Sequence, residues 1–511
     1  MKQFLLNVLL APRQPQVPVF AAVLALLSGC AAGPDYVRPA MALPTTYTPE
    51  PVTPSGAASQ ADADRQTLAV GQDIPAQWWR LFHSTELNAL IEASLQRNPS
   101  IEAAQAALRG ALENQHAQEG TRYPTVDASY TPTRQKVAGV LASPLSSNSY
   151  YYNLHTAQVS VSYTPDLWGG NRRQIESLQA QAESQRYQLI ATRLTLSSNV
   201  ANAAIQEAAL RGQIEATHQI IDGQASLLAT QRRLLALGQV AAADVATQEA
   251  ALANVRMTLP PLEKQLAAQR NQLAALAGRL PADGVGASFT LTDLQLPGTL
   301  PLTLPSTLVE QRPDVRAAEE LLHAASADVG VATANRLPNI TLGVSTYGSS
   351  ASSISELFKS GTGFWSLTGS ITQPLFDGGT LKHRQGAAQA AYDQAAAQYR
   401  ATVVNAFQNV ADALGAIQHD AVALEVATEA ERASSKSLAM ARRQLALGDI
   451  SPMALLANEQ AWQQARLGLV QAQASRLADT VALFQALGGG WWNETDAARQ
   501  ADAKAAGVSS R

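Results

Sequence analysis

The sequence contains two kinds of hydrophobic pattern. Long stretches almost free of proline and rich in Ala, Gln, Leu, Arg and Glu predict helices, because these residues favour helix whereas an interior proline costs about 3 kcal/mol. These stretches predict helices at 171–237, 241–278, 379–446 and 452–487. Between them lie short segments in which apolar and polar residues alternate one by one, which is the period of a half-buried β-strand.

The alternating segments come in two pairs and predict two β-hairpins. Residues 340–345 and 365–372 alternate strictly, and the first half of the chain repeats the pattern, so we predict hairpins at about 125–164 and 339–373. A small soluble sheet fits this alternation, and so does a membrane sheet with an apolar outer face and a polar inner face. Since a transmembrane barrel needs at least about 8 strands, four strands per chain would require an oligomer.

Landmarks of the first half recur in the second half in the same order, which predicts an internal duplication. We therefore expect a first repeat at 76–297, a second repeat at 298–490 and a C-terminal tail at 491–511. The recurring landmarks are Tyr123-Pro124 and Leu337-Pro338, displaced by 214 residues; Leu167-Trp168 and Leu375-Phe376, displaced by 208; and the segments from Arg232 to Gly238 and from Arg442 to Gly448, displaced by 210.

The N-terminal part predicts export and lipidation. Residues 17–29 form an apolar run that is too short for a membrane span but typical of a signal peptide. Leu27 to Cys30 resembles a lipobox, so we expect a lipoprotein signal peptide at 1–29 and a lipid on Cys30, the only cysteine. An ordinary signal peptide beside an uninvolved Cys30 is the alternative. Seven prolines between 34 and 75 predict an extended tether at 30–75.

Composition excludes several classes of function. With 37 Lys+Arg against 41 Asp+Glu, the formal charge of -4 predicts no nucleic-acid partner. A single cysteine excludes an intrachain disulfide and a thiolate-clustered metal site. The seven histidines form no HExxH pair, and the chain contains neither a GxSxG motif nor a phosphate loop. We therefore expect no enzyme, no metal and no cofactor apart from the lipid on Cys30.

Several motifs, taken in order, resemble TolC-like outer-membrane factors, specifically the lipoprotein subfamily that serves resistance-nodulation-division (RND) efflux pumps. They are CAAGPDYVRP from Cys30, WWRLF from Trp78, Asn98-Pro99, WSLTGSITQPLFDGG from Trp365, and ALGGGW ending at Trp491. The resemblance implies an α+β membrane protein in the bacterial outer membrane with a large periplasmic portion. It also implies a homotrimer, in which four strands per chain form a 12-stranded outer-membrane β-barrel continuous with a long periplasmic α-helical barrel.

In this family the helix turns at the periplasmic tip meet the adaptor protein, and acids near them form a gate. The family's acid after the first turn corresponds to Asp244. Besides lining the gate, Asp244 has two alternative roles, as a helix N-cap or as a surface charge. After the second turn the family positions are Ala454 and Ala457, so Asp449 and Glu459 are substitute candidates, each equally a solvated charge. The candidate residues for the tip and adaptor contact are Arg232, Arg233, Gly238, Arg442, Arg443 and Gly448.

The resemblance implies a passive exit duct for drugs or other small toxic compounds. An inner-membrane RND-type transporter and a periplasmic adaptor would deliver them. Two alternatives remain open at this point: a duct for protein or peptide secretion, and a non-channel, lipid-anchored periplasmic coiled-coil protein.

Overall fold

The computed structural model describes residues 32–41, 44–49, 66–141 and 149–494. These residues form two compact units, each assembled from separate parts of the chain. Unit 1 contains described residues within 1–39, 110–182 and 320–397, and unit 2 contains those within 40–109, 183–319 and 398–511. Cys30 and the signal peptide lie outside the described residues. Among the described helices, none is long and apolar enough to cross a membrane.

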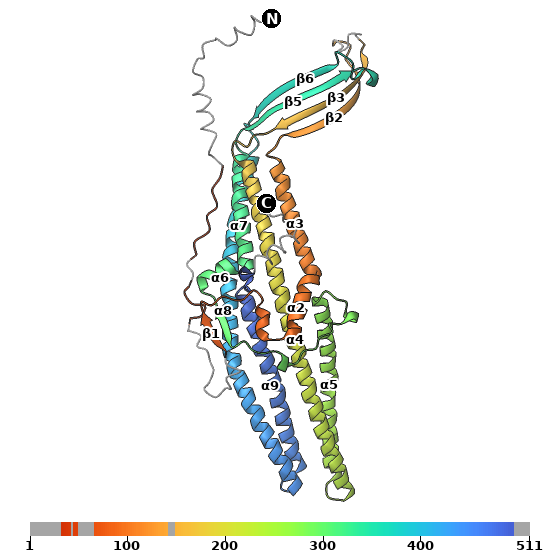
Figure 1. Ribbon diagram of the computed structural model, residues 1–511, viewed down its shortest axis with the longest axis vertical. Coiled ribbons are helices and arrows are strands. Elements are labelled where there is room, and N and C mark those ends of the chain that lie inside the picture. Colours follow the sequence, from red (N-terminus) through yellow and green to blue (C-terminus); the bar gives the residue numbers. More distant parts are fainter. Residues whose placement is uncertain (1–31, 42–43, 50–65, 142–148, 495–511) are drawn as a thin grey trace. The chain divides into compact units, whose positions relative to one another are not determined.

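Unit 1 contains a four-stranded antiparallel sheet of order β2-β3-β5-β6 (Figure 1). Its strands are β2 (Thr125–Lys136), β3 (Tyr151–Tyr163), β5 (Asn339–Ala351) and β6 (Gly363–Thr372). Both predicted hairpins are confirmed, and β3 of the first hairpin pairs with β5 of the second. The side chains of Leu342 and Val344, part of the predicted alternation, lie outside what the structure describes.

Four helices enter or leave this sheet, and each has residues in both units. They are α3 (Pro99–Gly120), α4 (Gly170–Ala236), α7 (Pro313–Ala334) and α8 (Thr380–Leu447). Helices α4 and α8 are 67 and 68 residues long, and their bounds lie within one residue of the predicted ones. Helices of such length are favoured because Ala, Gln and Leu lose little rotamer freedom in a helix.

Unit 2 contains two helical hairpins, α4 with α5 and α8 with α9, whose helices run side by side (Figure 1). In these hairpins α5 spans Ala242–Leu276 and α9 spans Pro452–Ala486, and the shorter helices of the unit are α2 (Thr85–Arg97) and α6 (Pro305–Gln311). Single 3₁₀ turns occur in both units at η2 (Trp78–Phe82), η3 (Pro281–Asp283), η4 (Leu291–Asp293), η5 (Ile354–Glu356) and η6 (Trp491–Asn493).

Helix lengths confirm the internal duplication. Helices α3 and α7 are both 22 residues long, α5 and α9 are both 35 residues long, and each repeat continues through a hairpin of strands. The two compact units therefore do not coincide with the two repeats, because each unit gathers equivalent parts of both.

Helix α5 continues through Pro260 and Pro261, although interior prolines normally break a helix. Each proline leaves a carbonyl four residues earlier without its amide donor. Those carbonyls belong to Arg256 and Met257, which are exposed, so water can supply the missing hydrogen bond. An exposed helix face thus tolerates an interior proline, whereas on a buried face the unpaired carbonyl would have no water to bond.

The prediction of an extended tether over 30–75 is wrong for residues 66–75, which pack in unit 2. Residues Thr67–Val70 form strand β1, which pairs in parallel with β4 (Thr299–Leu302). Ile74 is fully buried, and Gln66 is buried and hydrogen-bonds to Thr480. In an isolated proline-rich segment the backbone N–H and C=O groups bond to water, whereas in β1 they can pair with β4. The segment therefore packs against this strand.

Candidate functional site

The first helix turn, between α4 and α5, is closed by backbone hydrogen bonds. Gly238 has a φ of +70°, a conformation that costs other residues energy, and its amide donates to the Leu235 carbonyl. The next amide, of Gln239, donates to the Leu234 carbonyl at 2.9 Å. This pair of bonds is the Schellman arrangement that ends a helix at glycine. Asp244 accepts a hydrogen bond from the Ala241 amide at 3.3 Å and so caps the start of α5.

The second turn, between α8 and α9, repeats this geometry. Gly448 has a φ of +80° and donates to the Leu445 carbonyl, and the Asp449 amide donates to the Gln444 carbonyl. The Ser451 hydroxyl accepts from the Ala454 amide at 3.3 Å, and a proline follows at the first helical position. Gly448 therefore ends α8, Ser451 caps the start of α9, and Asp449 is exposed at the turn.

One arginine of each predicted pair binds a glutamate of the facing helix. Arg232 contacts Glu249 at 2.6 Å, and Arg442 contacts Glu459 at 3.6 Å, with the same spacing along the chain in both repeats. Glu459 is only 5% exposed, so it is not a solvated charge. Burial raises the pKa of Glu459, and Arg442 opposes that shift. Arg233 donates to the Ala229 carbonyl in its own helix, and Arg443 is exposed.

The sheet of unit 1 carries its large apolar side chains on an exposed face. Cross-strand pairing aligns residues of all four strands in rows, and neighbours in a row share one face. One row contains Ala128, Val159, Tyr347 and Trp365, of which the last three are 45%, 71% and 76% exposed. The adjacent row, on the opposite face, contains Asp127, Ser160, Thr346 and Ser366.

A sheet that packs on a soluble core has its apolar row buried, and here that row is exposed. Val126 and Leu367 extend the same apolar face and are 67% and 72% exposed. An exposed apolar face opposite a polar one is the pattern of a strand with lipid on one side and water on the other. Unit 1 therefore supplies a surface suited to a bilayer.

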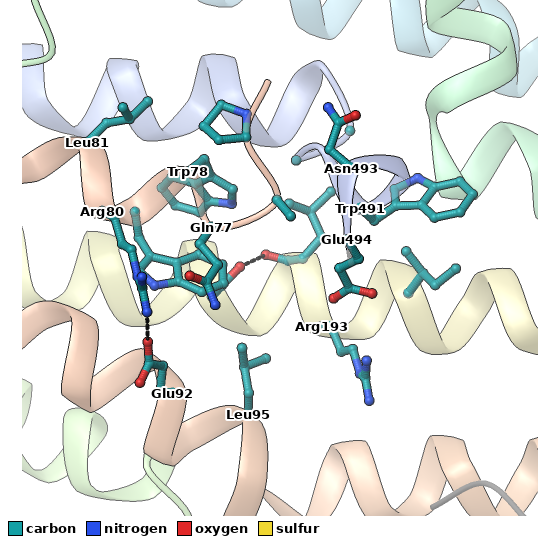
Figure 2. Close-up of a pocket in the computed structure, with 18 of the residues that line it drawn as sticks. Gln77, Trp78, Arg80, Leu81, Glu92, Leu95, Arg193, Trp491, Asn493 and Glu494 are labelled. Carbon is teal, nitrogen blue, oxygen red and sulfur yellow. Dashed lines mark hydrogen bonds and ion pairs between the residues drawn. The ribbon is translucent and has the colours of Figure 1, made fainter. Parts of the chain in front are cut away.

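In unit 2 the WWRLF and ALGGGW motifs meet around a pocket of about 880 Å³ (Figure 2). Trp78 stacks on Phe484 with ring centroids 5.4 Å apart, and Arg80 binds Glu92 at 2.9 Å at the pocket wall. A Cβ on Gly490 would lie 2.4 Å from the Ile74 carbonyl oxygen, so only glycine fits there. These motifs contribute buried side chains to the core of unit 2. The pocket that they line was not predicted from the sequence.

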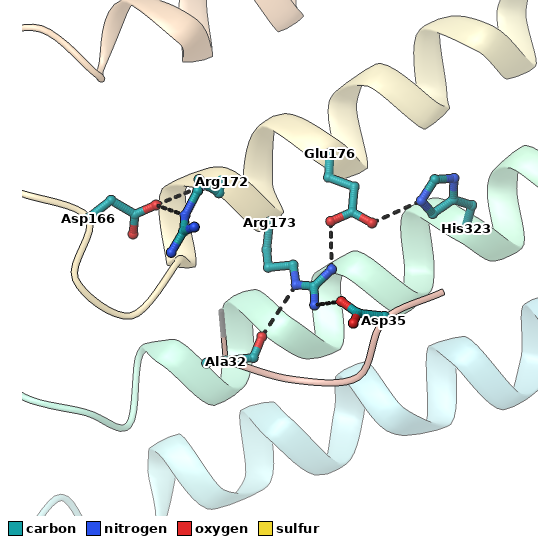
Figure 3. A network of polar contacts seen from close by, with 7 residues as sticks. All are labelled: Ala32, Asp35, Asp166, Arg172, Arg173, Glu176 and His323. Atoms are coloured by element: carbon teal, nitrogen blue, oxygen red, sulfur yellow. Dashed lines mark hydrogen bonds and ion pairs between the residues drawn. The ribbon is translucent and has the colours of Figure 1, made fainter. Parts of the chain in front are cut away.

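In unit 1 a charged network holds the start of the described chain (Figure 3). Arg173 contacts Asp35 at 2.5 Å and Glu176 at 2.7 Å, and it is only 5% exposed. His323 contacts Glu176 at 2.9 Å and stacks on Tyr36 with centroids 4.5 Å apart. Hydrogen bonds to Glu320 and then Glu176 raise the pKa of His323 although burial lowers it. No spacing rule predicts this network, because its contacts join residues far apart along the chain, such as His323 with Glu176, 147 residues away.

Comparison with known proteins agrees with these features. A family model described as "Outer membrane efflux protein" matches residues 90–279 and 304–489. The pyoverdine export outer membrane protein OpmQ of Pseudomonas putida is 31% identical over 87% of this chain and 94% of its own length. The toluene efflux pump outer membrane protein TtgC of Pseudomonas putida is 28% identical over 93% and 96% of the two chains.

Among solved structures, the outer membrane protein VceC of Vibrio cholerae superposes with a TM-score of 0.75 and 27% identity, covering 81% of this chain and 99% of that chain. The resemblance to TolC-like factors is thereby confirmed, and the alternative of a non-channel periplasmic coiled coil is wrong. The chain belongs to the outer membrane efflux protein family and is an outer-membrane component of an efflux system.

Proposed function

We propose that the protein is the passive exit duct of a three-part efflux pump. The observation that carries this proposal is the exposed apolar face of the sheet in unit 1, which faces away from the polar row through Asp127 and Ser366. Such a sheet separates lipid from a water-filled interior. The duct supplies a path and no chemical step, so the protein is not an enzyme.

The pore is shared between chains. Four strands are too few to close a transmembrane barrel, for which about 8 is the minimum. Three copies supply 12 strands, so we propose a homotrimer whose long helices line the periplasmic part of the duct. Outer strands β2 and β6 have partners on one side only within the described sheet, which leaves two edges for neighbouring copies.

Acids at the two helix turns are proposed to narrow the pore at the periplasmic end. Asp244 and Asp449 follow equivalent turns, and threefold repetition would place each in a ring of like charges. Rings of carboxylates favour cations and repel anions. Glu459 is excluded from such a ring because it is buried against Arg442.

The partners follow from the place of the duct in the pump. The turns around Gly238 and Gly448, with Arg233 and Arg443 beside them, are proposed to contact a periplasmic adaptor, which joins the duct to an RND-type inner-membrane transporter. Relatives named for pyoverdine and toluene support small molecules as substrates. We therefore propose export of drugs or other small toxic compounds, rather than secretion of proteins or peptides.

The lipid anchor on Cys30 is a separate proposal, since this residue lies outside the described part of the chain. An integral sheet and a lipid anchor can be told apart by replacing the leader with an unlipidated secretory leader and introducing Cys30→Ala. A duct should stay in the outer membrane through alkaline washing, because the apolar sheet face holds it there. Release of this variant into the wash would contradict the proposed membrane sheet.

The gate is tested by conductance in planar bilayers. Asp244→Asn keeps an acceptor for the Ala241 amide while removing the charge, so it changes the ring and preserves the cap. We expect larger conductance and weaker cation selectivity for Asp244→Asn and Asp449→Asn than for wild type. Asp222→Asn, at an exposed position within α4, is the matched control. Equal conductance in all four proteins would remove both acids from the gate.

A further inference from the structure

The end of the first hairpin docks on the second repeat within unit 1. After β3, the Trp168 indole nitrogen donates to the Pro338 carbonyl at 2.7 Å, just past the end of α7. A Cβ on Gly170 would lie 3.0 Å from the Ala334 Cβ, so the start of α4 and the end of α7 touch. Leu337, beside Pro338, is partly covered by this contact.

The equivalent residues after the second hairpin have no such cover among the described residues. Leu375 and Phe376 stand where the first repeat has Leu167 and Trp168. They are 96% and 93% exposed, whereas Trp168 is 36% exposed and Leu167 is half-buried. Two adjacent large apolar side chains with this exposure form an apolar surface patch, and such patches mark sites of interaction.

The matching surface lies before β2, at the opposite edge of the sheet from β6, and it is equally exposed. Residues Ala334, Leu337 and Pro338 correspond to Gly120, Tyr123 and Pro124 at the end of α3, displaced by 214. Tyr123 is 70% exposed, and a Cβ on Gly120 would meet no atom within 4 Å. The surface that receives Trp168 in the second repeat is thus present in the first repeat, where no described residue occupies it.

One chain cannot bring the two surfaces together. Leu375 follows β6 and Tyr123 precedes β2, and these strands are the opposite edges of the sheet. Joining them within one chain would close a four-stranded transmembrane barrel, which is too small. In a head-to-tail arrangement, each copy presents one surface and receives the other, and a closing rotation gives a ring.

We propose that Leu375 and Phe376 of one copy dock on Gly120, Tyr123 and Pro124 of the next copy, as Leu167 and Trp168 dock on the end of α7 within the chain. This joint rests on the proposed function in one respect, the assembly of three copies. It also places β6 beside β2 of the neighbour in the antiparallel order that β3 and β5 adopt. The internal repeat thereby alternates one contact within the chain with one between chains.

The test links engineered cysteines with a short bismaleimide in membranes. The chain that carries both Tyr123→Cys and Phe376→Cys should give covalent dimers and trimers on a denaturing gel, while each single variant stays at the mass of one chain. The matched control is Trp168→Cys with Leu337→Cys, the equivalent pair within the chain. It should be linked without any increase in mass. Leu375→Cys with Pro124→Cys is a second interchain pair, which tests the same contact if the first double variant fails to fold.

The mass of the uncrosslinked protein in mild detergent separates this proposal from the proposed function. Covalent trimers formed by either interchain pair support the joint. A trimeric mass without interchain links, while the control pair reacts, overturns the joint and leaves the duct intact. A monomeric mass with no interchain link overturns the joint and the proposed trimer together.

Discussion

At the scale of single residues, the most perturbed acid of the described chain is Asp479 on α9. Burial and a hydrogen bond to Asp420 on α8 raise the pKa of Asp479 from 3.8 to about 7. An acid whose pKa is raised on folding binds its proton more tightly in the folded state. The free energy of unfolding should therefore decrease as pH rises from about 4 to about 7.

Asp479→Asn should remove most of this pH dependence, because asparagine keeps a donor toward Asp420 and carries no charge. The measurement is the thermal unfolding midpoint between pH 4 and pH 8, compared with Asp412→Asn at an exposed position of α8. A wild-type midpoint that rises steadily over this range would contradict the assigned pair.

Arg173 is predicted to hold the start of the described chain. Its guanidinium is buried and contacts Asp35 and Glu176, so Arg173→Met removes both ion pairs while keeping most of the volume. We expect faster chymotrypsin cleavage after Tyr36 in this variant. Neighbouring Arg172 contacts only Asp166, at 3.6 Å, in the network of Figure 3, so Arg172→Met should leave cleavage unchanged. Equal cleavage in both variants would show that Arg173 does not hold the segment.

Local residues were predictable from the sequence, and distant partners were not. Gly238 and Gly448 could be placed at the helix turns because the end of a helix depends on neighbours a few positions away. The contacts of Arg173 and Asp479 join segments far apart along the chain, and no spacing rule connects them. The Arg232–Glu249 ion pair is an exception that the sequence could have indicated, because Arg442 and Glu459 recur with the same spacing in the second repeat.

At the scale of elements, the two turn glycines should resist substitution. Gly238→Ala and Gly448→Ala place a side chain at positive φ, at a cost of about 1 kcal/mol each. Gly468→Ala is the matched control inside α9, where a Cβ meets open space. It should stabilise by roughly 0.5–1 kcal/mol. The measurement is amide hydrogen exchange of the last helical turns, and faster exchange in Gly468→Ala would contradict the argument.

The faces of the sheet make a second prediction at this scale. Trp365 is on the exposed apolar face and Ser366 is on the polar face. In a bilayer, Trp365→Arg should cost about 2–4 kcal/mol near mid-depth and lower the amount of protein in the outer membrane. Ser366→Arg should be tolerated. Equal amounts of both variants in purified outer membranes would mean that the apolar face does not contact lipid.

Elements were predicted where one pattern extended over many residues. The four long helices and both hairpins followed from composition and period, and the helix bounds agreed within two residues. The β1 and β4 strands were missed because each has four residues, and they pair across 232 positions, as Thr67 does with Thr299. Their pairing depends on the fold around them, as does the packing of residues 66–75, which were expected to belong to an extended tether.

At the scale of the whole molecule, duplication explains how one chain provides a repeating wall. Each repeat supplies two strands and a long helical hairpin, and β3 with β5 shows how one repeat joins the next. The exposed surfaces at Phe376 and Tyr123 extend that rule from repeats to copies. In the proposed duct, the function of the protein is the space that its copies enclose.

The most direct test is single-channel recording of the purified mature protein, preceded by measurement of its mass in detergent. We expect a trimeric species that conducts ions across a planar bilayer, with a preference for cations. A species that never conducts, whether trimeric or monomeric, would contradict the assignment of this chain as a duct.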